Sequence, residues 1–259
     1  MSPEAKALLQ AWDRAEPIPP LSNTRDLSPA DAYAIADEVK SARIARSERP
    51  VGRKIGFTNR TIWDTFGVSA PIWGWVYHTT FGQIPGDGKI CLSGVAEPRI
   101  EPEISFHLRA TPSPDMDILA LAGCIDWFAA GFEIVTSPYA NWKFKAPDTM
   151  AAQGMHARLY LGPRIPMSKV TTQQLEEFST RLTGPGQSFD GQARNVLDGP
   201  LHALAHLMQE LAAHGSDPLG EGEVVTTGTL TDAPYIHPGE GCFPGFAGLP
   251  APNLRVHFT

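Results

Sequence analysis

The sequence is poor in cysteine and has no long apolar stretch. Its three cysteines, Cys91, Cys124 and Cys242, lie far apart and form no CxxC pair or Cys/His cluster, which argues against a disulfide framework and against a zinc site. No apolar run approaches the ~20 residues of a transmembrane helix. The opening segment, MSPEAKALLQAWDRAEP, carries acidic residues where a secretory signal peptide has a basic end and an apolar run. We therefore expect a reducing cytoplasmic location and no membrane association.

Basic residues are also scarce. The chain has 21 lysines and arginines against 28 aspartates and glutamates, which gives a net charge of −7 and a pI of about 5.6. The densest basic stretch spaces Lys40, Arg43, Arg46 and Arg49 along an expected helix. This spacing is typical of a solvated helix face rather than of a phosphate-binding track. We therefore expect no nucleic-acid partner.

Proline and glycine, in contrast, are abundant at 24 residues each. This share of proline favours turns and short strands over a helical bundle. Helices are nevertheless expected over residues 3–14, over 28–45 and from about 200 to 214. The second of these has clear start signals, because Ser28 can cap it and Pro29 suits its first position.

The pattern of residues along the chain changes at Val51. From there on, short apolar runs alternate with glycine and proline, which predicts strands joined by turns. We expect an N-terminal helical segment over residues 1–50 and a β-rich catalytic domain over residues 51–259.

One predicted strand carries two glutamates on a single face. Side chains alternate faces along a strand, so residues 100–108 place apolar side chains on one face and Glu101, Glu103, Ser105 and His107 on the other. The face could simply meet water. Two adjacent like charges, however, favour a bound cation.

A third glutamate lies in another strand-like run. Glu133 is flanked by apolar residues, and a buried carboxylate is costly unless it is paired or ligated. Three carboxylates from two strands suit a hard cation such as Mg²⁺ or Mn²⁺. Glu101, Glu103 and Glu133 are therefore candidate metal ligands.

A further strand presents a cation and a hydroxyl together. In residues 51–58, Lys54, Gly56 and Thr58 share one face, and glycine lets a ligand approach the main chain. These residues could bind a small carboxylate, although an ordinary surface lysine gives the same pattern. The polar, aromatic and basic segment 136–149 could close over such a site or be a plain connection.

Taken in order, these segments resemble the fumarylacetoacetate hydrolase superfamily, most closely its 2-keto-4-pentenoate hydratase and 2-oxo-3-hexenedioate decarboxylase branch. The resemblance implies an α+β fold, a mixed β-roll with an N-terminal helical segment, that assembles as a homo-oligomer. The matching pieces are residues 54–58, 101–106, 131–135, 142–149, 222–231 and 254–258.

The resemblance also implies roles for particular residues. Mg²⁺ or Mn²⁺ is expected on the three glutamates, and Lys54 is expected in proton transfer or in binding the substrate's oxygens. Lys145 and Asp148 are expected to support catalysis, and Thr229 to lie near the substrate carboxylate together with Gly56 and Thr58. Lys54, beside a cation and partly desolvated, is expected to have a lowered pKa.

Three positions depart from the family pattern. Thr136 and Ile72 stand where relatives usually carry an acidic residue, and Gln153 stands in a segment that lacks the usual Asp-Asn pair. The metal and lysine positions are kept, so these departures leave the substrate and the reaction open.

The favoured hypothesis is a metal-dependent lyase of aromatic catabolism that hydrates 2-hydroxypenta-2,4-dienoate, a small 2-oxo acid in its enol form. A 2-oxo-3-hexenedioate (4-oxalocrotonate) decarboxylase is the alternative, because both reactions need a stabilised enolate. An acylpyruvate-type C–C hydrolase is disfavoured, since the first histidine is His78. A non-catalytic 2-oxo-acid-binding or assembly subunit, associated with a pathway enzyme, is the alternative outside enzymology.

Overall fold

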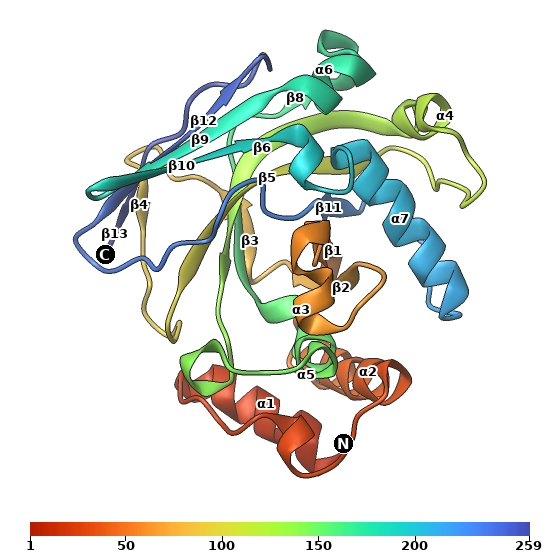
Figure 1. Ribbon diagram of the computed structural model, residues 1–259, viewed down its shortest axis with the longest axis vertical. Coiled ribbons are helices and arrows are strands. Elements are labelled where there is room, and N and C mark those ends of the chain that lie inside the picture. Colours follow the sequence, from red (N-terminus) through yellow and green to blue (C-terminus); the bar gives the residue numbers. More distant parts are fainter.

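The protein is built around two β-sheets, with helices at the periphery. The computed structural model describes residues 1–259 (Figure 1). The larger sheet has the strand order β2-β1-β11-β5-β6-β7-β3, with β8 paired to β6. Its strands are β1 (Pro50–Gly56), β2 (Ile72–Tyr77), β3 (Phe81–Gln83), β5 (Arg99–Leu108), β6 (Ile125–Val135), β7 (His156–Leu161), β8 (Ile165–Pro166) and β11 (Val224–Thr226).

The smaller sheet has the order β10-β9-β12-β13-β4. It lies beside one end of the long strands β5 and β6, and together the curled sheets give the β-roll character that the sequence predicted (Figure 1). Its strands are β4 (Lys89–Ile90), β9 (Ser179–Gly184), β10 (Gln187–Gln192), β12 (Gly241–Ala247) and β13 (Val256–Phe258).

The three long helices form as predicted. Helix α2 (Pro29–Ala45) begins with a capping box, in which the Ser28 hydroxyl accepts from the Asp31 amide and the Asp31 carboxylate accepts from the Ser28 amide. This pair satisfies two backbone donors at the helix start. The other helices are α1 (Pro3–Arg14), α3 (Trp63–Phe66), α4 (Ile118–Gly123), α5 (Ala146–Ala151), α6 (Thr172–Glu177) and α7 (Pro200–Ala213).

The N-terminal helices are part of the same packed body. Figure 1 shows α1 and α2 at one end of the molecule, next to α5. Buried residues of α1 and α2 form one apolar cluster with residues of the sheet and of α5, among them Ile72, Val135 and Met150. None of the helices has the length and apolar character that a membrane crossing requires.

The hairpin β9–β10 and strand β12 were not predicted. β10 is polar and largely exposed, so its sequence lacks the apolar alternation that marks a strand. Its register is set entirely by pairing with β9, in which Gln187 lies opposite Gly184. Local patterns cannot reveal such a strand, because its stability comes from a partner strand.

Pro102 lies in the middle of β5 without costing a ladder bond. Its carbonyl accepts from Leu230, so the main-chain polar atoms of Pro102 face away from β6. On that side β11 ends at Thr226, which pairs with Ser105. The missing amide of Pro102 therefore falls where no neighbouring strand needs a donor.

Gly74 in β2 gives a direct test of how the sheet meets the loop at Gln153. A Cβ on Gly74 would lie 2.0 Å from the Gln153 carbonyl oxygen, whereas a Cβ on Gly82 would meet nothing within 4 Å. We expect Gly74→Ala to lower the free energy of unfolding by about 1–3 kcal/mol or more, because backbone must move. Gly82→Ala is the control, and equal stability of the two variants in denaturant titrations would contradict this packing.

Candidate metal centre and active-site cavity

The structure brings the three predicted glutamates together. Glu101 and Glu103 come from β5 and Glu133 from β6, and the antiparallel register places Glu101 directly opposite Glu133. Carboxylate oxygens of all three lie within 4.8 Å of one another. Glu103 and Glu133 are completely buried. Buried carboxylates at this separation repel one another and require positive charge nearby.

Two of these carboxylates have fixed orientations. Oε2 of Glu103 accepts from the Gly228 amide at 2.8 Å and from the Thr226 hydroxyl. Oε1 of Glu133 lies 2.7 Å from Nδ1 of His156, and Oε2 lies 3.0 Å from Nζ of Lys54. Oε1 of Glu103, in contrast, is buried without a hydrogen-bond partner. A free carboxylate oxygen among other carboxylates fits a hard divalent cation, which takes oxygen ligands.

Burial and neighbouring charges shift the pKa values of the three carboxyl groups in different directions. Burial, with a contribution from Glu133, raises the pKa of Glu101 to about 7, although Lys54 opposes the shift. Burial and the two neighbouring carboxylates raise the pKa of Glu103 well above its usual value. Burial acts on Glu133 too, but Lys54 and His156 outweigh it and lower its pKa. Glu133 is thus the most readily ionised of the three.

Lys54 lies at the centre of these charges. Lys54 of β1 pairs with Thr226 of β11, and Thr226 pairs with Ser105 of β5. The Lys54 side chain therefore reaches across β11 toward β5. Nζ donates to the Gly154 carbonyl at 2.8 Å in addition to pairing with Glu133. Burial would lower the pKa of Lys54, but the three carboxylates raise it above the usual value. In the protein alone the carboxylates thus outweigh desolvation, and the lowered pKa expected for Lys54 beside a bound cation stays a prediction.

His156 is a site residue that the sequence analysis missed. Its Nε2 lies 2.8 Å from the Thr80 hydroxyl, while Nδ1 faces Glu133. Burial lowers the pKa of His156. Both ring nitrogens thus have a polar partner, Glu133 at Nδ1 and Thr80 at Nε2, which fixes the orientation of the ring. Only the pairing of β6 with β7 reveals this contact, so no local sequence signal could have found it.

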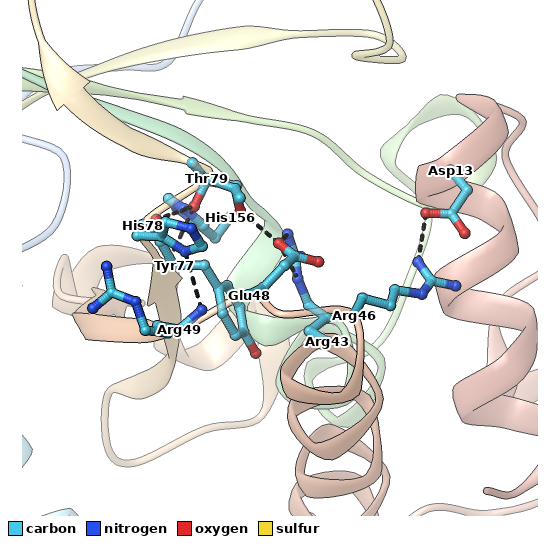
Figure 2. Close-up of polar contacts among 10 residues, drawn as sticks. Asp13, Arg43, Arg46, Glu48, Arg49, Tyr77, His78, Thr79 and His156 are labelled. Atoms are coloured by element: carbon cyan, nitrogen blue, oxygen red, sulfur yellow. Dashed lines mark hydrogen bonds and ion pairs between the residues drawn. The ribbon is translucent and has the colours of Figure 1, made fainter.

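A polar network lies behind His156 (Figure 2). Glu48 accepts from Nη2 of Arg43 at 2.9 Å and from the Thr79 hydroxyl at 2.5 Å, and Arg46 pairs with Asp13. These contacts connect the end of α2 to the turn after β2 and to α1. They hold in place the turn that carries Thr80, and through it the ring that contacts Glu133.

A cavity of about 190 Å³ opens beside the carboxylates. The predicted binding residues Gly56, Thr58 and Thr229 all line it. The turn at Gly228 has a φ of 96° and passes so close to Thr58 that a Cβ there would lie 2.0 Å from the Thr58 hydroxyl oxygen. Only glycine fits both conditions. The lining residues are Lys54, Ile55, Gly56, Phe57, Thr58, Asn59, Ile62, Phe66, Ile72, Glu101, Val135, Trp142, Phe144, Thr149, Gly154, Met155, Gly228 and Thr229.

Lys145 and Asp148 are not brought to this cavity. The Lys145 side chain is exposed and lines a separate hollow beside the N-terminal segment. Asp148 is fully buried and accepts from the amide and hydroxyl of Ser22 at 2.9 and 2.7 Å and from the Lys145 amide at 2.8 Å. The structure thus gives Asp148 a connecting role between the N-terminal segment and α5, and the catalytic roles expected for Lys145 and Asp148 stay a prediction.

The three departures from the family pattern have different places. Ile72 lines the cavity. The Thr136 hydroxyl donates to the Ala96 carbonyl. Gln153 accepts from the Trp75 amide at 2.9 Å and donates to the Ala36 carbonyl at 2.7 Å. Gln153 therefore joins β2 to α2, whereas only the change at Ile72 alters the cavity wall.

Several known proteins are similar to this chain in sequence and in fold. A 2-keto-4-pentenoate hydratase of Paraburkholderia xenovorans (strain LB400) is 31% identical over 240 residues, which cover 91% of this chain and 87% of that relative. The chain belongs to the 2-keto-4-pentenoate hydratase and 4-oxalocrotonate decarboxylase family. A 4-oxalocrotonate decarboxylase of Pseudomonas sp. (strain CF600) is 28% identical over 241 residues, covering 92% of this chain and 89% of that relative.

A solved structure shows that the similarity covers the whole fold of this chain. The 4-oxalocrotonate decarboxylase from Pseudomonas putida G7, complexed with magnesium and adipate, superposes with a TM-score of 0.91 at 25% identity, over 99% of this chain and 96% of that one. No family model matches the chain. The resemblance to the hydratase and decarboxylase branch that the sequence indicated is confirmed.

The raised pKa values of Glu101 and Glu103 predict how a divalent cation stabilises this family member. In the protein alone, the pKa of Glu101 is raised to about 7. Between the usual carboxyl pKa and pH 7, the folded state therefore binds more protons than the unfolded state. Stability then falls as pH rises toward 7. A cation requires the ionised carboxylates and removes this penalty. We expect Mn²⁺ or Mg²⁺ to raise the thermal unfolding midpoint more at about pH 8 than at about pH 5.5.

The variant Glu103→Gln checks the origin of this effect. It should reduce the cation-induced shift at the higher pH, while Glu177→Gln, which alters an exposed glutamate of α6, should keep it. A shift that is independent of pH, or unchanged in Glu103→Gln, would show that the cation binds elsewhere.

Lys145 and Asp148 can be separated by substitution. We expect Lys145→Ala to change the free energy of unfolding by no more than about 0.5 kcal/mol and to leave turnover near wild type, because the side chain is exposed. Asp148→Ala should cost about 1–3 kcal/mol, since it leaves buried donors without an acceptor. Denaturant titrations and steady-state rates measure both effects. A large loss of kcat in a normally folded Lys145→Ala protein would support a catalytic role for Lys145 and contradict this expectation.

Proposed function

We propose that the protein is a divalent-metal-dependent lyase that hydrates 2-hydroxypenta-2,4-dienoate or a close homologue. The observation that carries the proposal is the cluster of Glu101, Glu103 and Glu133 beside buried Lys54 at the wall of a cavity. Membership in a family whose relatives are hydratases and decarboxylases supports the same conclusion.

We assign the three glutamates as the ligands of Mg²⁺ or Mn²⁺. The unpartnered Oε1 of Glu103 supports this assignment, as does the magnesium in the related decarboxylase structure. When bound, the cation supplies a Lewis acid that stabilises negative charge on the 2-oxo oxygen of the substrate.

The chain's own residues would bind the substrate and move its protons. The Lys54 ammonium has three hydrogens, of which Gly154 and Glu133 engage two. The third is available to a substrate oxygen in the cavity. The Thr58 hydroxyl and the main chain at Gly56 and Thr229 line the same wall and are suited to the substrate carboxylate. In the net reaction the hydroxyl of water adds to C4, a proton adds to C5, and the enol proton ends on C3.

The second candidate is decarboxylation of 2-oxo-3-hexenedioate, which the likeness to 4-oxalocrotonate decarboxylase favours. In that reaction the bond from C5 to the departing carboxylate breaks, and its electron pair passes into the same enolate. A C–C hydrolase receives less support, because no histidine lines the cavity to activate water.

Assembly and location extend the proposal. We expect a cytoplasmic homo-oligomer that can associate with a pathway enzyme, as the family resemblance implies. The mass of the purified protein in solution tests the first of these points.

The activity is tested by the ultraviolet band of 2-hydroxypenta-2,4-dienoate. We expect its loss to require Mg²⁺ or Mn²⁺ and to yield 4-hydroxy-2-oxopentanoate. Glu103→Gln should lower kcat/KM by at least about 100-fold through loss of metal binding, and Lys54→Met by roughly 10²–10⁴-fold through loss of an acid. Lys89→Ala, at an exposed lysine, is the matched control.

The outcomes separate the candidates. If the protein does not hydrate the dienoate but releases CO₂ from 2-oxo-3-hexenedioate, the proposed activity becomes that of a decarboxylase. Bound metal with no turnover of either substrate would indicate a non-catalytic 2-oxo-acid-binding subunit. Absence of metal binding would overturn the assignment of the three glutamates.

A further inference from the structure

The cavity has charge at one end only. Among the side chains that line it, Lys54 and Glu101 are the only charged ones, and both belong to the carboxylate cluster. The remaining wall consists of apolar and aromatic side chains with a few neutral polar groups. A ligand that binds at the cluster therefore extends into a region without cations.

Four aromatic rings form a continuous part of this wall. Phe57 stacks on Phe66 with ring centroids 4.7 Å apart, and Phe66 stacks on Phe144 at 5.8 Å. Trp142 continues the series, 6.2 Å from Phe144. The rings come from the segment after β1, from α3 and from the loop between β6 and α5. Three separate segments thus place apolar surface at the same position.

Backbone strain is concentrated in the same wall. Phe57, Trp142 and Met155 have φ values of 55°, 55° and 66°, in the left-handed region that large side chains avoid. Such residues cost of the order of 1–3 kcal/mol each and persist where the surrounding structure holds them, often at ligand sites. All three line the cavity. The surrounding structure therefore holds three residues of this wall in fixed, strained conformations.

Four cationic side chains of neighbouring segments lie outside the lining of the cavity. Arg99 lies between the Trp142 and Tyr235 rings, 4.5 and 4.1 Å from their centroids, and donates to Ala233. Arg60 pairs with Asp198. Lys143 and Lys145 line the separate hollow next to the N-terminal segment. None of these four lines the cavity.

We infer that the end of the substrate remote from the metal ligands is an uncharged hydrocarbon group rather than a second carboxylate. The inference rests on the proposed function and narrows it to monocarboxylic 2-hydroxydienoates that carry either hydrogen or an apolar substituent at C5. A second carboxylate would lose its water in this wall without gaining a cationic partner, which is costly. A hydrocarbon group in the same place gains from burial, about 0.8 kcal/mol per CH₂.

Binding of non-reacting 2-oxo acids to the Mg²⁺-loaded protein tests this directly. 2-Oxohexanoate and 2-oxoadipate have six carbons each and differ in their far end, a methyl against a carboxylate. 2-Oxobutanoate lacks the far end and reports on the metal end alone. In calorimetric titrations we expect 2-oxohexanoate to bind at least about tenfold more tightly than 2-oxoadipate, with 2-oxobutanoate weaker than 2-oxohexanoate.

Substitution of Phe66 provides the second arm. Phe66→Lys should narrow or reverse the preference by giving a second carboxylate a partner, whereas Phe66→Leu, which keeps an apolar wall, should preserve it. Circular dichroism verifies that both variants are folded. The comparison of the three acids in the wild-type protein decides the question even if Phe66→Lys does not fold.

The outcomes distinguish the two levels of the proposal. Tighter or equal binding of 2-oxoadipate would overturn the inference about the far end and leave the metal-dependent 2-oxo-acid site intact. Failure of all three acids to bind to the metal-loaded protein would overturn the proposed function itself, and with it the inference.

Discussion

Mutual repulsion among three neighbouring carboxylates, of which Glu103 and Glu133 are fully buried, is the constraint on which the site depends. The register of β5 and β6 sets Glu101 opposite Glu133 and leaves Glu103 two residues along the same face. No arrangement of apolar side chains could stabilise this charge. The protein supplies Lys54, the Gly228 amide and a histidine to individual oxygens. One buried oxygen of Glu103 remains without a partner, and this is the oxygen that the proposed divalent cation would bind.

The surrounding fold can be understood as support for these groups. β11 brings the Thr226 hydroxyl and the Gly228 amide to Glu103 and ends there. β7 begins with His156, whose ring is held by Thr80 in the turn after β2. The N-terminal segment secures that turn through Glu48 (Figure 2). It secures the start of α5 through Ser22, whose hydroxyl donates to Asp148. Segments that lie far apart in the sequence therefore converge on the orientation of two carboxylates.

The same family chemistry serves hydration and decarboxylation, because both reactions pass through an enolate at the metal end. The substrates of the two reactions differ at the end remote from the metal. The hydratase substrate has a hydrocarbon there, and the decarboxylase substrate has a carboxylate. In this chain that end of the cavity is formed by Phe57, Phe66, Phe144 and Trp142 and holds no cation. We therefore expect the wall of the cavity, rather than the three glutamates, to distinguish the two reactions.

The sequence by itself determined the features that depend on local pattern. Period-two alternation placed Glu101 and Glu103 on one face, cap residues located the start of α2, and the ordered motifs indicated the family. The tertiary structure decided the features that depend on register and on long-range contact. It set Glu133 opposite Glu101, brought Lys54 across β11, added His156 and left Lys145 outside the cavity. It also gathered the aromatic wall from three segments. The physical reason is that alternation and capping act between neighbours in the chain, whereas register and cavity lining arise from pairing between strands and loops that are remote in sequence.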